Sequence, residues 1–386
     1  MAKDTLRILQ WNARYISANF KYLKQYVDNI NPHVISIQSL NVNFYNLPKL
    51  KGYFYPPVTN IPTHKNSKLH TALYLRDDTQ YVPILSPVSK ESFEAYGCAI
   101  KIKLNDNEDL NIGSIYLPKG PNPGNLDWID YINQSSSSWL ITGDFNSHSS
   151  YWDSTCVKTS HVDFENKLLS SNLVILNDGR FTRVPEVKGH RPPALDLSLL
   201  SPKLADLCTW DIYDDTLGSD HYPIIIDIND YEEQLDEEDL IPKFQYKKVN
   251  WEKFKEVLNN ENLEINDDVE AIFSQFVSSV INAAKISIPV VKKPKIRNKN
   301  CNVWWTEECE VKRKDKNRAV RHWLKDTKDD VLTKTKQQAN VISNKTIAEA
   351  QVNYWIRFCL EEIHEPTDGP KVWKEVTKMN KRATPK

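Results

Sequence analysis

Apolar and polar residues alternate in short runs along residues 1–230, which is the pattern of β-strands that bury one face. The run at 5–12 is typical, and it ends at Asn12. Apolar residues at helical spacing predict helices over 20–30, closed by Asn31-Pro32, and over 161–171. Strands are predicted at 5–12, 34–38, 71–76, 80–86, 97–104, 111–117, 139–143, 173–176, 194–200 and 222–228.

Two pairs of these strands flank short turn sequences. The strands at 71–76 and 80–86 flank Asp77-Asp78, and those at 97–104 and 111–117 flank Asn105–Asn107, so each pair is predicted to be neighbours in a sheet. Many strands with few helices indicate an α+β fold in which two sheets pack face to face with helices outside.

The buried strand at 139–143 ends in an unusual group of polar residues. Gly143 is predicted to turn the chain, and Asp144, Asn146 and His148 follow it. A rigid strand that ends in this way can aim polar side chains into a cleft. The alternative is a turn in which the Asp and Asn side chains only satisfy local backbone N–H groups.

The pattern changes to helices beyond residue 230. Eight of the thirteen residues 227–239 are carboxylates, which predicts a linker at 231–245 between a domain at 1–230 and a helical segment at 246–386. Helices are predicted at 251–258, 269–284 and 306–358, with a basic, proline-containing stretch at 292–299. No polymerase motif occurs in this segment.

Charge is divided unevenly between the two parts. Residues 241–386 hold 29 Lys and Arg against 20 Asp and Glu, whereas residues 1–240 hold 21 against 31. The basic part suits an anionic partner, and solvated charged helices are the alternative. Tryptophans lie among its cations, which suits nucleic-acid contact with stacking, unless they only pack the helices together. These residues are Lys312, Arg313, Lys314, Lys316, Arg318, Arg321 and Lys325, with Trp304, Trp305, Trp323 and Trp355.

Composition bounds the remaining possibilities. Apolar residues make up 40% and charged residues 26% of the chain, and no apolar run approaches the roughly 18 residues that a membrane span needs. The N-terminus shows no apolar signal region. The six cysteines form no Cys-x-x-Cys pair, which argues against a zinc ribbon and favours free thiols in a reducing compartment. We therefore expect an intracellular protein, nuclear or cytoplasmic, that has no membrane partner.

Polar residues stand at the ends of several predicted strands, far apart in the sequence. Hydrolysis of a phosphodiester needs a carboxylate for the water, a cation or protonated imidazole for the phosphoryl charge, and donors that hold the geometry. This set supplies all three kinds of group. Its members are Asn12, Gln38, Tyr116, Asp144, Asn146, Asp196, Asp220 and His221.

The ordered set resembles the endonuclease/exonuclease/phosphatase superfamily. More narrowly, three stretches are similar to the apurinic-type endonuclease domain of jockey-like non-long-terminal-repeat retrotransposons, which begins the reverse-transcriptase reading frame. They are Gly143–His148, Asn177-Asp178-Gly179 with Thr182, and Trp304-Trp305 with Glu307-Glu308-Cys309. The resemblance implies a four-layer α/β sandwich and magnesium-dependent nicking of target DNA that primes reverse transcription. It also implies that residues 246–386 are a connector, with element RNA as a candidate partner of its basic helices.

The resemblance also implies roles for individual residues. Asp144 would orient or deprotonate the attacking water, and Asn146 would steady that water and the phosphate. His221 would stabilise the phosphoryl charge while Asp196 holds its imidazole. Tyr116 and Asn12 would contact the phosphate or the metal shell. Asp220, with Asn12, would help to ligate the metal.

One position departs from the family pattern. The family places a metal-ligating glutamate after Ile-Gln, and this chain has Ser39 there. A neutral hydroxyl is a poor ligand for a hard cation, so we expect Mg²⁺ to be weakly bound or absent. Losing one well-placed electrostatic group costs on the order of 10²–10³ in rate. The alternative function is a catalytically inactive, host-adopted or decayed element protein that binds nucleic acid or protein. A phosphatase or lipid phosphodiesterase fits the narrower motifs less well.

Overall fold

The structure is a computed structural model, and it divides the chain into two compact units. One unit joins Met1–Glu233 to Lys299–Lys386, and the other is Gln234–Asn298. The boundaries predicted at 230 and 245 stay a prediction. Residues 233–247, which contain most of the expected acidic linker, and the basic stretch at 292–299 lie outside the described residues. The structure describes residues 4–43, 46–56, 68–88, 95–105, 108–153, 156, 158–185, 189–232, 248–260, 269–289, 303–362 and 372.

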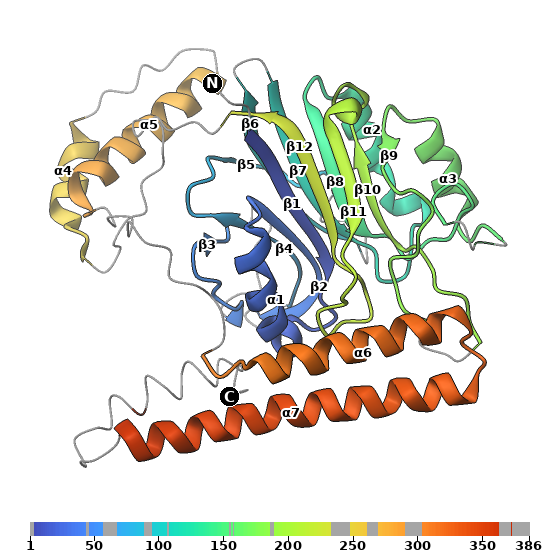
Figure 1. Ribbon diagram of the computed structural model, residues 1–386. Helices are drawn as coiled ribbons and strands as arrows, with labels where there is room; N and C mark the ends of the chain where they lie inside the picture. The colour runs from blue at the N-terminus through green and yellow to red at the C-terminus, as the bar shows by residue number, and fades with distance from the viewer. Residues whose placement is uncertain are drawn as a thin grey trace. The chain divides into compact units, whose positions relative to one another are not determined.

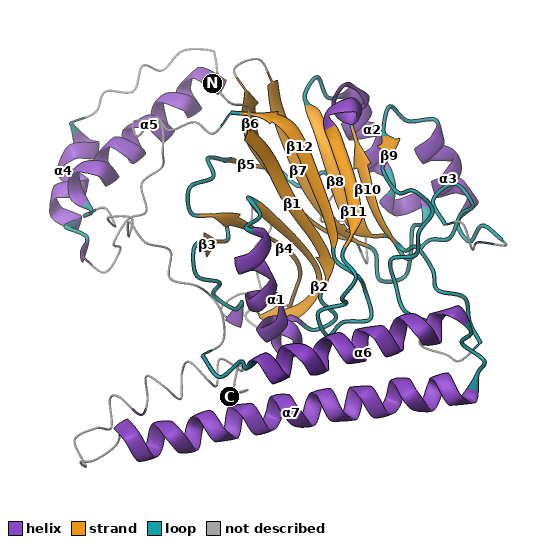
Figure 2. Ribbon diagram, viewed as in Figure 1, coloured by secondary structure: helices purple, strands orange, loops and turns teal. Residues whose placement is uncertain are grey.

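Two six-stranded sheets form the centre of the larger unit (Figures 1 and 2). The first sheet has the order β11-β12-β1-β2-β4-β3, and the second has the order β5-β6-β7-β8-β10-β9. Both sheets are mixed, because β1 runs parallel to β2 and β7 runs parallel to β8. The strands of the first sheet are β1 (Asp4–Asn12), β2 (Val34–Asn43), β3 (Tyr53–Phe54), β4 (Lys68–Arg76), β11 (Cys208–Ile212) and β12 (Ile224–Tyr231). Those of the second are β5 (Val82–Ile84), β6 (Tyr96–Asn105), β7 (Glu108–Tyr116), β8 (Ser138–Asp144), β9 (Val174–Ile175) and β10 (Asp196–Leu200).

Strand β1 shows how the alternating pattern builds the layers. Leu6 and Ile8 point into the core between the sheets, where they pack with apolar residues of β7 and β8. Leu9 and Trp11 point the other way, into a core that they share with helix α1 (Ile16–Ile30). Helices α2 (Asp127–Gln134) and α3 (Val162–Leu169) cover the outer face of the second sheet. The fold is therefore the expected sandwich of two packed mixed sheets with flanking helices. Short 3₁₀ helices occupy Pro123–Asn125 and Pro202–Leu207.

Several local predictions were wrong. The strands at 71–76 and 80–86 do not pair, because β4 joins the first sheet and β5 joins the second. Strand β2 does not end at Ser39 but continues through a register irregularity to Asn43. Helix α2 and strand β11 were not predicted. The turn residues at 178–180 also suggest a hairpin-like stretch, but Gly179 there makes an isolated bridge to Asp153.

Gly143 has a different purpose from the one expected. It lies inside strand β8 rather than at a turn, and an added Cβ would overlap the carbonyl oxygen of Ile115 on the neighbouring strand. The chain turns instead at Asn146, whose φ of 45° is left-handed. Asparagine tolerates that backbone conformation better than most residues. Glycine therefore permits close approach of two backbones, and asparagine makes the turn.

The C-terminal helical region predicted as one stretch is two helices. Helix α6 (Glu307–Lys325) and helix α7 (Asp330–Glu362) lie side by side in Figure 1. Trp304 just before α6, Cys309 of α6 and Ile347 of α7 are buried in the same core as α1. The helix pair, which we call the C-terminal hairpin, thus packs within the sheet-containing unit because it shares that unit's apolar core.

The smaller unit contains two described helices, α4 (Trp251–Asn259) and α5 (Val269–Ser287). Asn250 begins α4, and its side chain accepts a hydrogen bond from the Lys253 backbone N–H at 3.0 Å. Ala284 and Ile288 pack with Phe254 to form a small apolar cluster. Within the described part of the chain, no helix has the length and apolar character that crossing a membrane requires.

Candidate active site

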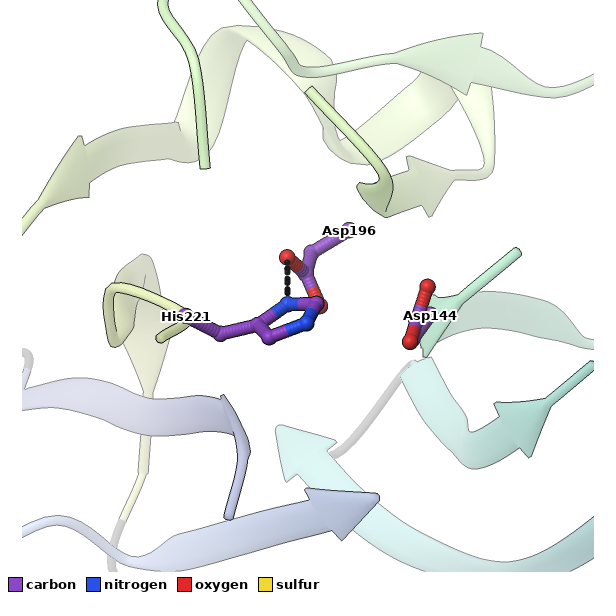
Figure 3. Close-up of side chains that lie close together, drawn as sticks. All are labelled: Asp144, Asp196 and His221. Atoms are coloured by element: carbon purple, nitrogen blue, oxygen red, sulfur yellow. Dashed lines mark hydrogen bonds and ion pairs between the residues drawn. The ribbon is translucent and has the colours of Figure 1, made fainter. Parts of the chain in front are cut away.

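Strands from both sheets bring the predicted polar residues to one place. In the second sheet, Asp144 at the end of β8 stands beside Tyr116 on β7 and beside Asp196 on β10. From the first sheet, Asn12 ends β1 and donates from Nδ2 to Asp144 Oδ2 at 2.7 Å. His221 precedes β12. Ligand atoms of Asp144, Asp196 and His221 all lie within 4.8 Å of one another (Figure 3). We call these three residues the strand-end cluster.

Asp144 is nearly inaccessible to solvent, with 2% of its surface exposed. Its Oδ1 accepts from the Asn146 backbone N–H at 3.0 Å, and its Oδ2 accepts from the Asn146 Nδ2 at 3.3 Å. Burial and the neighbouring Asp196 raise the pKa of Asp144 well above its usual value, against the opposing effects of His221, Asn146 and Asn12. The local turn bonds expected under the alternative interpretation are present, and the same carboxylate also faces the cluster.

His221 and Asp196 form a buried pair that fixes the imidazole. Their Nδ1 and Oδ2 atoms lie 2.7 Å apart, and the same Oδ2 accepts from the Thr182 hydroxyl at 2.6 Å. Burial alone would lower the pKa of His221, but Asp196, Asp144 and Asp220 outweigh it and raise the value. The imidazole is thus stabilised in its protonated form, with Nδ1 held by Asp196 and Nε2 lying 4.0 Å from Asp220 Oδ1.

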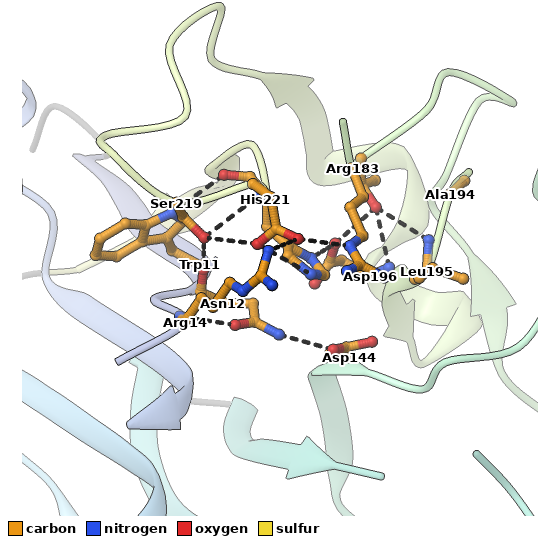
Figure 4. A network of polar contacts seen from close by, with 12 residues as sticks. Trp11, Asn12, Arg14, Asp144, Arg183, Ala194, Leu195, Asp196, Ser219 and His221 are labelled. Carbon is orange, nitrogen blue, oxygen red and sulfur yellow. Dashed lines mark hydrogen bonds and ion pairs between the residues drawn. The ribbon is translucent and has the colours of Figure 1, made fainter. Parts of the chain in front are cut away.

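Asp220, expected to help ligate a metal, is held by two guanidinium groups. Arg14 Nη1 and Arg183 Nε approach its Oδ2 at 2.7 Å and 2.8 Å, respectively, as part of the network in Figure 4. Ser219 connects this network to β1, because its hydroxyl donates to the Asn12 carbonyl oxygen at 2.8 Å. Sequence reasoning missed both arginines; the available signal was their position directly after site residues, Arg14 near Asn12 and Arg183 next to Thr182.

Tyr116 lies at the rim of the cluster beside Ser39, the position that departs from the expected family pattern. The Ser39 side chain lies close enough to the Tyr116 hydroxyl to lower its pKa. Burial raises the pKa of Tyr116, and the charge of Asp144 adds to the effect. Ser39 has a left-handed φ of 54°, at the irregularity in β2. The neutral side chain that replaces the family's glutamate therefore does lie next to a predicted site residue.

Two other residues from the sequence set lie apart from the cluster. Gln38 is fully buried between the sheets and donates from Nε2 to the hydroxyls of Ser36 and Ser114, each at 2.9 Å. His148 Nδ1 lies 3.8 Å from Asp153 Oδ2 and remains 42% exposed. Gln38 therefore joins the sheets, and His148 lies in a solvent-facing loop.

The cluster fits a divalent cation in its donor set. Asp144 and Asp196 supply carboxylate oxygens, which hard cations prefer, while the protonated His221 offers no lone pair to a cation. The Asp196 Oδ1 atom is buried and has no hydrogen-bond partner among the described residues. A buried carboxylate oxygen without a partner is costly, and a cation would satisfy it. Ser39 adds no charge to this set. The metal-ligand roles predicted for Asp220 and Asn12, like the other predicted roles, stay predictions.

The C-terminal tryptophans pack rather than present their faces to solvent. Trp304 and Trp323 are 5% and 2% exposed, and Trp305 packs edge-on against Tyr22 of α1. Trp355 stacks on Phe358 of the same helix, at 5.6 Å between ring centroids. The packing interpretation of Trp304 and Trp323 therefore holds.

Comparison with known sequences finds similar proteins. Residues 110–225 match the family described as "Endonuclease-reverse transcriptase". Two Drosophila melanogaster proteins, described as probable RNA-directed DNA polymerases, are also similar. The protein from transposon BS is 25% identical over 299 residues, which is 75% of this chain and 32% of the relative. The protein from transposon X-element is 23% identical over 224 residues, which is 58% of this chain and 24% of the relative. The chain thus spans about a third or less of these relatives.

Solved structures with a related arrangement include two nucleases. The endonuclease domain of TRAS1, a telomere-specific non-LTR retrotransposon, is 18% identical, with a TM-score of 0.47 over 58% of this chain and 98% of that one. The AP endonuclease LMAP from Leishmania major is 13% identical, with a TM-score of 0.43 over 58% and 88% of the two chains. Over residues 110–225 this chain is therefore similar to the endonuclease–reverse transcriptase family, and its sequence resembles proteins encoded by two Drosophila transposons.

Proposed function

We propose that this protein is a metal-dependent phosphodiesterase that nicks target DNA to prime reverse transcription, weakened by the serine at position 39. The observation that carries the proposal is the buried convergence of Asp144, Asp196 and His221 from separate parts of the chain. Burying this many ionisable groups together costs folding free energy, so a purely structural explanation is unfavourable. Similarity to retrotransposon-encoded proteins, and to the endonuclease–reverse transcriptase family over residues 110–225, supports DNA as the substrate.

The roles follow from which atoms are already engaged. Asp144 keeps a fixed orientation through Asn12 and Asn146 and orients or deprotonates the attacking water. His221 gives its Nδ1 to Asp196 and uses Nε2 to stabilise charge on the phosphoryl oxygens. Asn146 and Tyr116 contact the water and the phosphate as neutral donors. Asn12 contributes to the phosphate or metal shell.

Mg²⁺ is the proposed cofactor, held by carboxylates of the cluster with help from Asn12 and Asp220. When bound, such an ion neutralises phosphoryl charge and positions the reacting oxygens. The pairing of Asp220 with Arg14 and Arg183 also gives it a second role, which is to hold two guanidinium groups beside His221. Guanidinium groups suit phosphate recognition because they donate in a fixed planar fork.

Nicking of supercoiled plasmid in the presence of Mg²⁺ tests the proposal. We expect slow nicking by the wild type, none by Asp144→Ala, and unchanged nicking by the control Asp130→Ala, whose side chain is 55% exposed on α2. Ser39→Glu restores a carboxylate beside Tyr116 and is expected to raise the rate on the order of 10²–10³-fold. Calorimetric titration with Mg²⁺ reports the accompanying gain in affinity.

Two results decide against the proposal. Nicking by Asp144→Ala at the wild-type rate would remove the cluster from the chemistry. A wild type that binds DNA without nicking it, with activity appearing only in Ser39→Glu, would establish the alternative function: an inactive element protein that acts as a nucleic-acid-binding module.

A further inference from the structure

A groove of about 270 Å³ opens next to the strand-end cluster. One wall is the loop before β12, including Ser219 and Asp220, which directly precede His221. The other wall is the C-terminal hairpin, with Lys316 on α6 and Lys336 on α7. Figure 4 shows Ser219 and His221 within one network. Because Ser219 also lines the groove, the groove lies directly beside the proposed active site.

The two lysines lack the partners that surface cations usually have. Each is half-buried, and neither makes an ion pair with a carboxylate among the described residues. The Lys336 ammonium rests 3.1 Å from the centre of the Trp323 ring. Burial lowers the pKa of both ammonium groups, and for Lys316 the nearby Arg313 adds to the effect. An anion in the groove would offset the cost of burying the two ammonium groups and the repulsion between Lys316 and Arg313.

The carboxylates of the groove are already occupied. Arg321 binds Asp214 at 2.6 Å, and Arg14 and Arg183 bind Asp220. These pairs offset the negative charge of the loop wall. The lysine charges on the hairpin wall therefore remain available to an external anion.

The hairpin holds these lysines in fixed positions relative to the loop. Arg313 of α6 makes a buried ion pair with Asp215 of the loop. Cys309 is fully buried against the core of the sheet-containing unit. Cations that are positioned before binding lose less conformational entropy when a ligand arrives.

We propose that this groove binds the phosphodiester backbone of the target DNA next to the scissile phosphate, with Lys316 and Lys336 as the contacting cations. The C-terminal hairpin is thereby part of the DNA-binding surface and is not only a connector. This inference rests on the proposed function, because it assumes that the scissile phosphate of the DNA lies at His221. Charge complementarity and continuity with the cluster select a phosphodiester strand as the occupant.

The test measures binding separately from cleavage. Fluorescence anisotropy with a labelled DNA duplex, in chelator and over a range of salt concentrations, compares the wild type with a Lys316→Gln/Lys336→Gln double variant. The matched control is Lys314→Gln/Lys345→Gln, which changes lysines that are 66% and 73% exposed and paired with glutamates on the same two helices. Circular dichroism melting confirms that all three proteins are folded.

We expect the groove variant to bind on the order of tenfold more weakly than the wild type, and the control to bind as the wild type does. The slope of log affinity against log salt should fall by about 0.9 for each DNA phosphate that the variant no longer neutralises. Plasmid nicking by the groove variant should fall with its binding, because the DNA is no longer held beside His221.

Other outcomes separate this inference from the proposed function. If the groove variant and the wild type bind the duplex with equal affinity and equal salt dependence, the groove proposal is overturned. Plasmid nicking by the wild type would still support the proposed function. If the wild type binds DNA through the groove but does not nick plasmid, the groove proposal stands and the proposed nicking activity is overturned. If the wild type does not bind the duplex, the proposal that the groove binds DNA is overturned. It is also overturned if the wild type prefers a single-stranded RNA of equal length and the groove variant loses that preference.

Discussion

The strand-end cluster and the C-terminal hairpin both concentrate charge, but they do so in opposite ways. Asp144, Asp196 and His221 are at most 4% exposed, and short hydrogen bonds fix each of them. Lys316 and Lys336 are half-buried on helices, without carboxylate partners among the described residues. A buried cluster has few orientations and strongly perturbed protonation, which suits chemistry. Partly solvated cations bind an anion with little desolvation, which suits holding a substrate.

The two regions also depend on different kinds of contact. The cluster depends on strand ends from both sheets, so it forms only when the two sheets pack together. The hairpin depends on one buried ion pair and a few apolar contacts with that sandwich. Changes in the cluster should therefore affect the chemical step, whereas changes in the hairpin should affect binding or stability.

The largest effect is expected for His221→Gln. Loss of the imidazolium removes a proton donor to the phosphoryl oxygens, so nicking should fall by about 10²–10⁴-fold. Duplex affinity in chelator should change little, because the contacting cations are elsewhere. Plasmid nicking and anisotropy measure the two quantities, with the exposed His190→Gln as control. A proportional loss of affinity would mean that the cluster binds DNA rather than acting on it.

The next effect is on the hairpin and appears in stability. Arg313→Ala leaves Asp215 buried without its cation, which should lower the free energy of unfolding by about 3–5 kcal/mol. Arg318→Ala is the control, since Arg318 is 65% exposed and pairs with Asp315, and such exposed pairs contribute about 0–1 kcal/mol. Urea unfolding followed by tryptophan fluorescence gives both values. Identical curves for the two variants would show that this ion pair does not hold α6 in place.

A smaller, pH-dependent effect is expected where the two regions meet. Burial alone would raise the pKa of Asp220, but His221, Arg183 and Arg14 outweigh it and lower the value. A depressed carboxyl pKa stabilises the fold above the unfolded value of about 3.9, and this stabilisation is lost as pH falls through the folded value. Asp220→Asn should therefore cost about 1.5–3 kcal/mol at pH 7, the range for hydrogen bonds to charged groups.

The measurement for Asp220 is chemical unfolding of both proteins between pH 7 and pH 3. Their stability difference should be constant near neutrality and shrink below about pH 4. A difference that grows on acidification would mean that Asp220 is destabilised by its surroundings, which contradicts its pairing with the two arginines.

Much of the sandwich was predictable because its information is local. Alternation at 5–12 and 111–117 reports which face of a strand is buried, and β1 and β7 lie at those places. The polar residues after these strands were visible for the same reason. The sequence could not assign β4 and β5 to different sheets, because strand pairing depends on contacts between distant residues.

By itself, the sequence determined most of the strands, their buried faces and the set of polar residues at their ends. Only the tertiary structure decided that Arg14 and Arg183 engage Asp220, that Gly143 admits a neighbouring carbonyl, and that α6 packs on the α1 side of the sandwich. The reason is physical: periodicity encodes burial along one element, whereas charge partners and close backbone approaches exist only after separate elements have packed together.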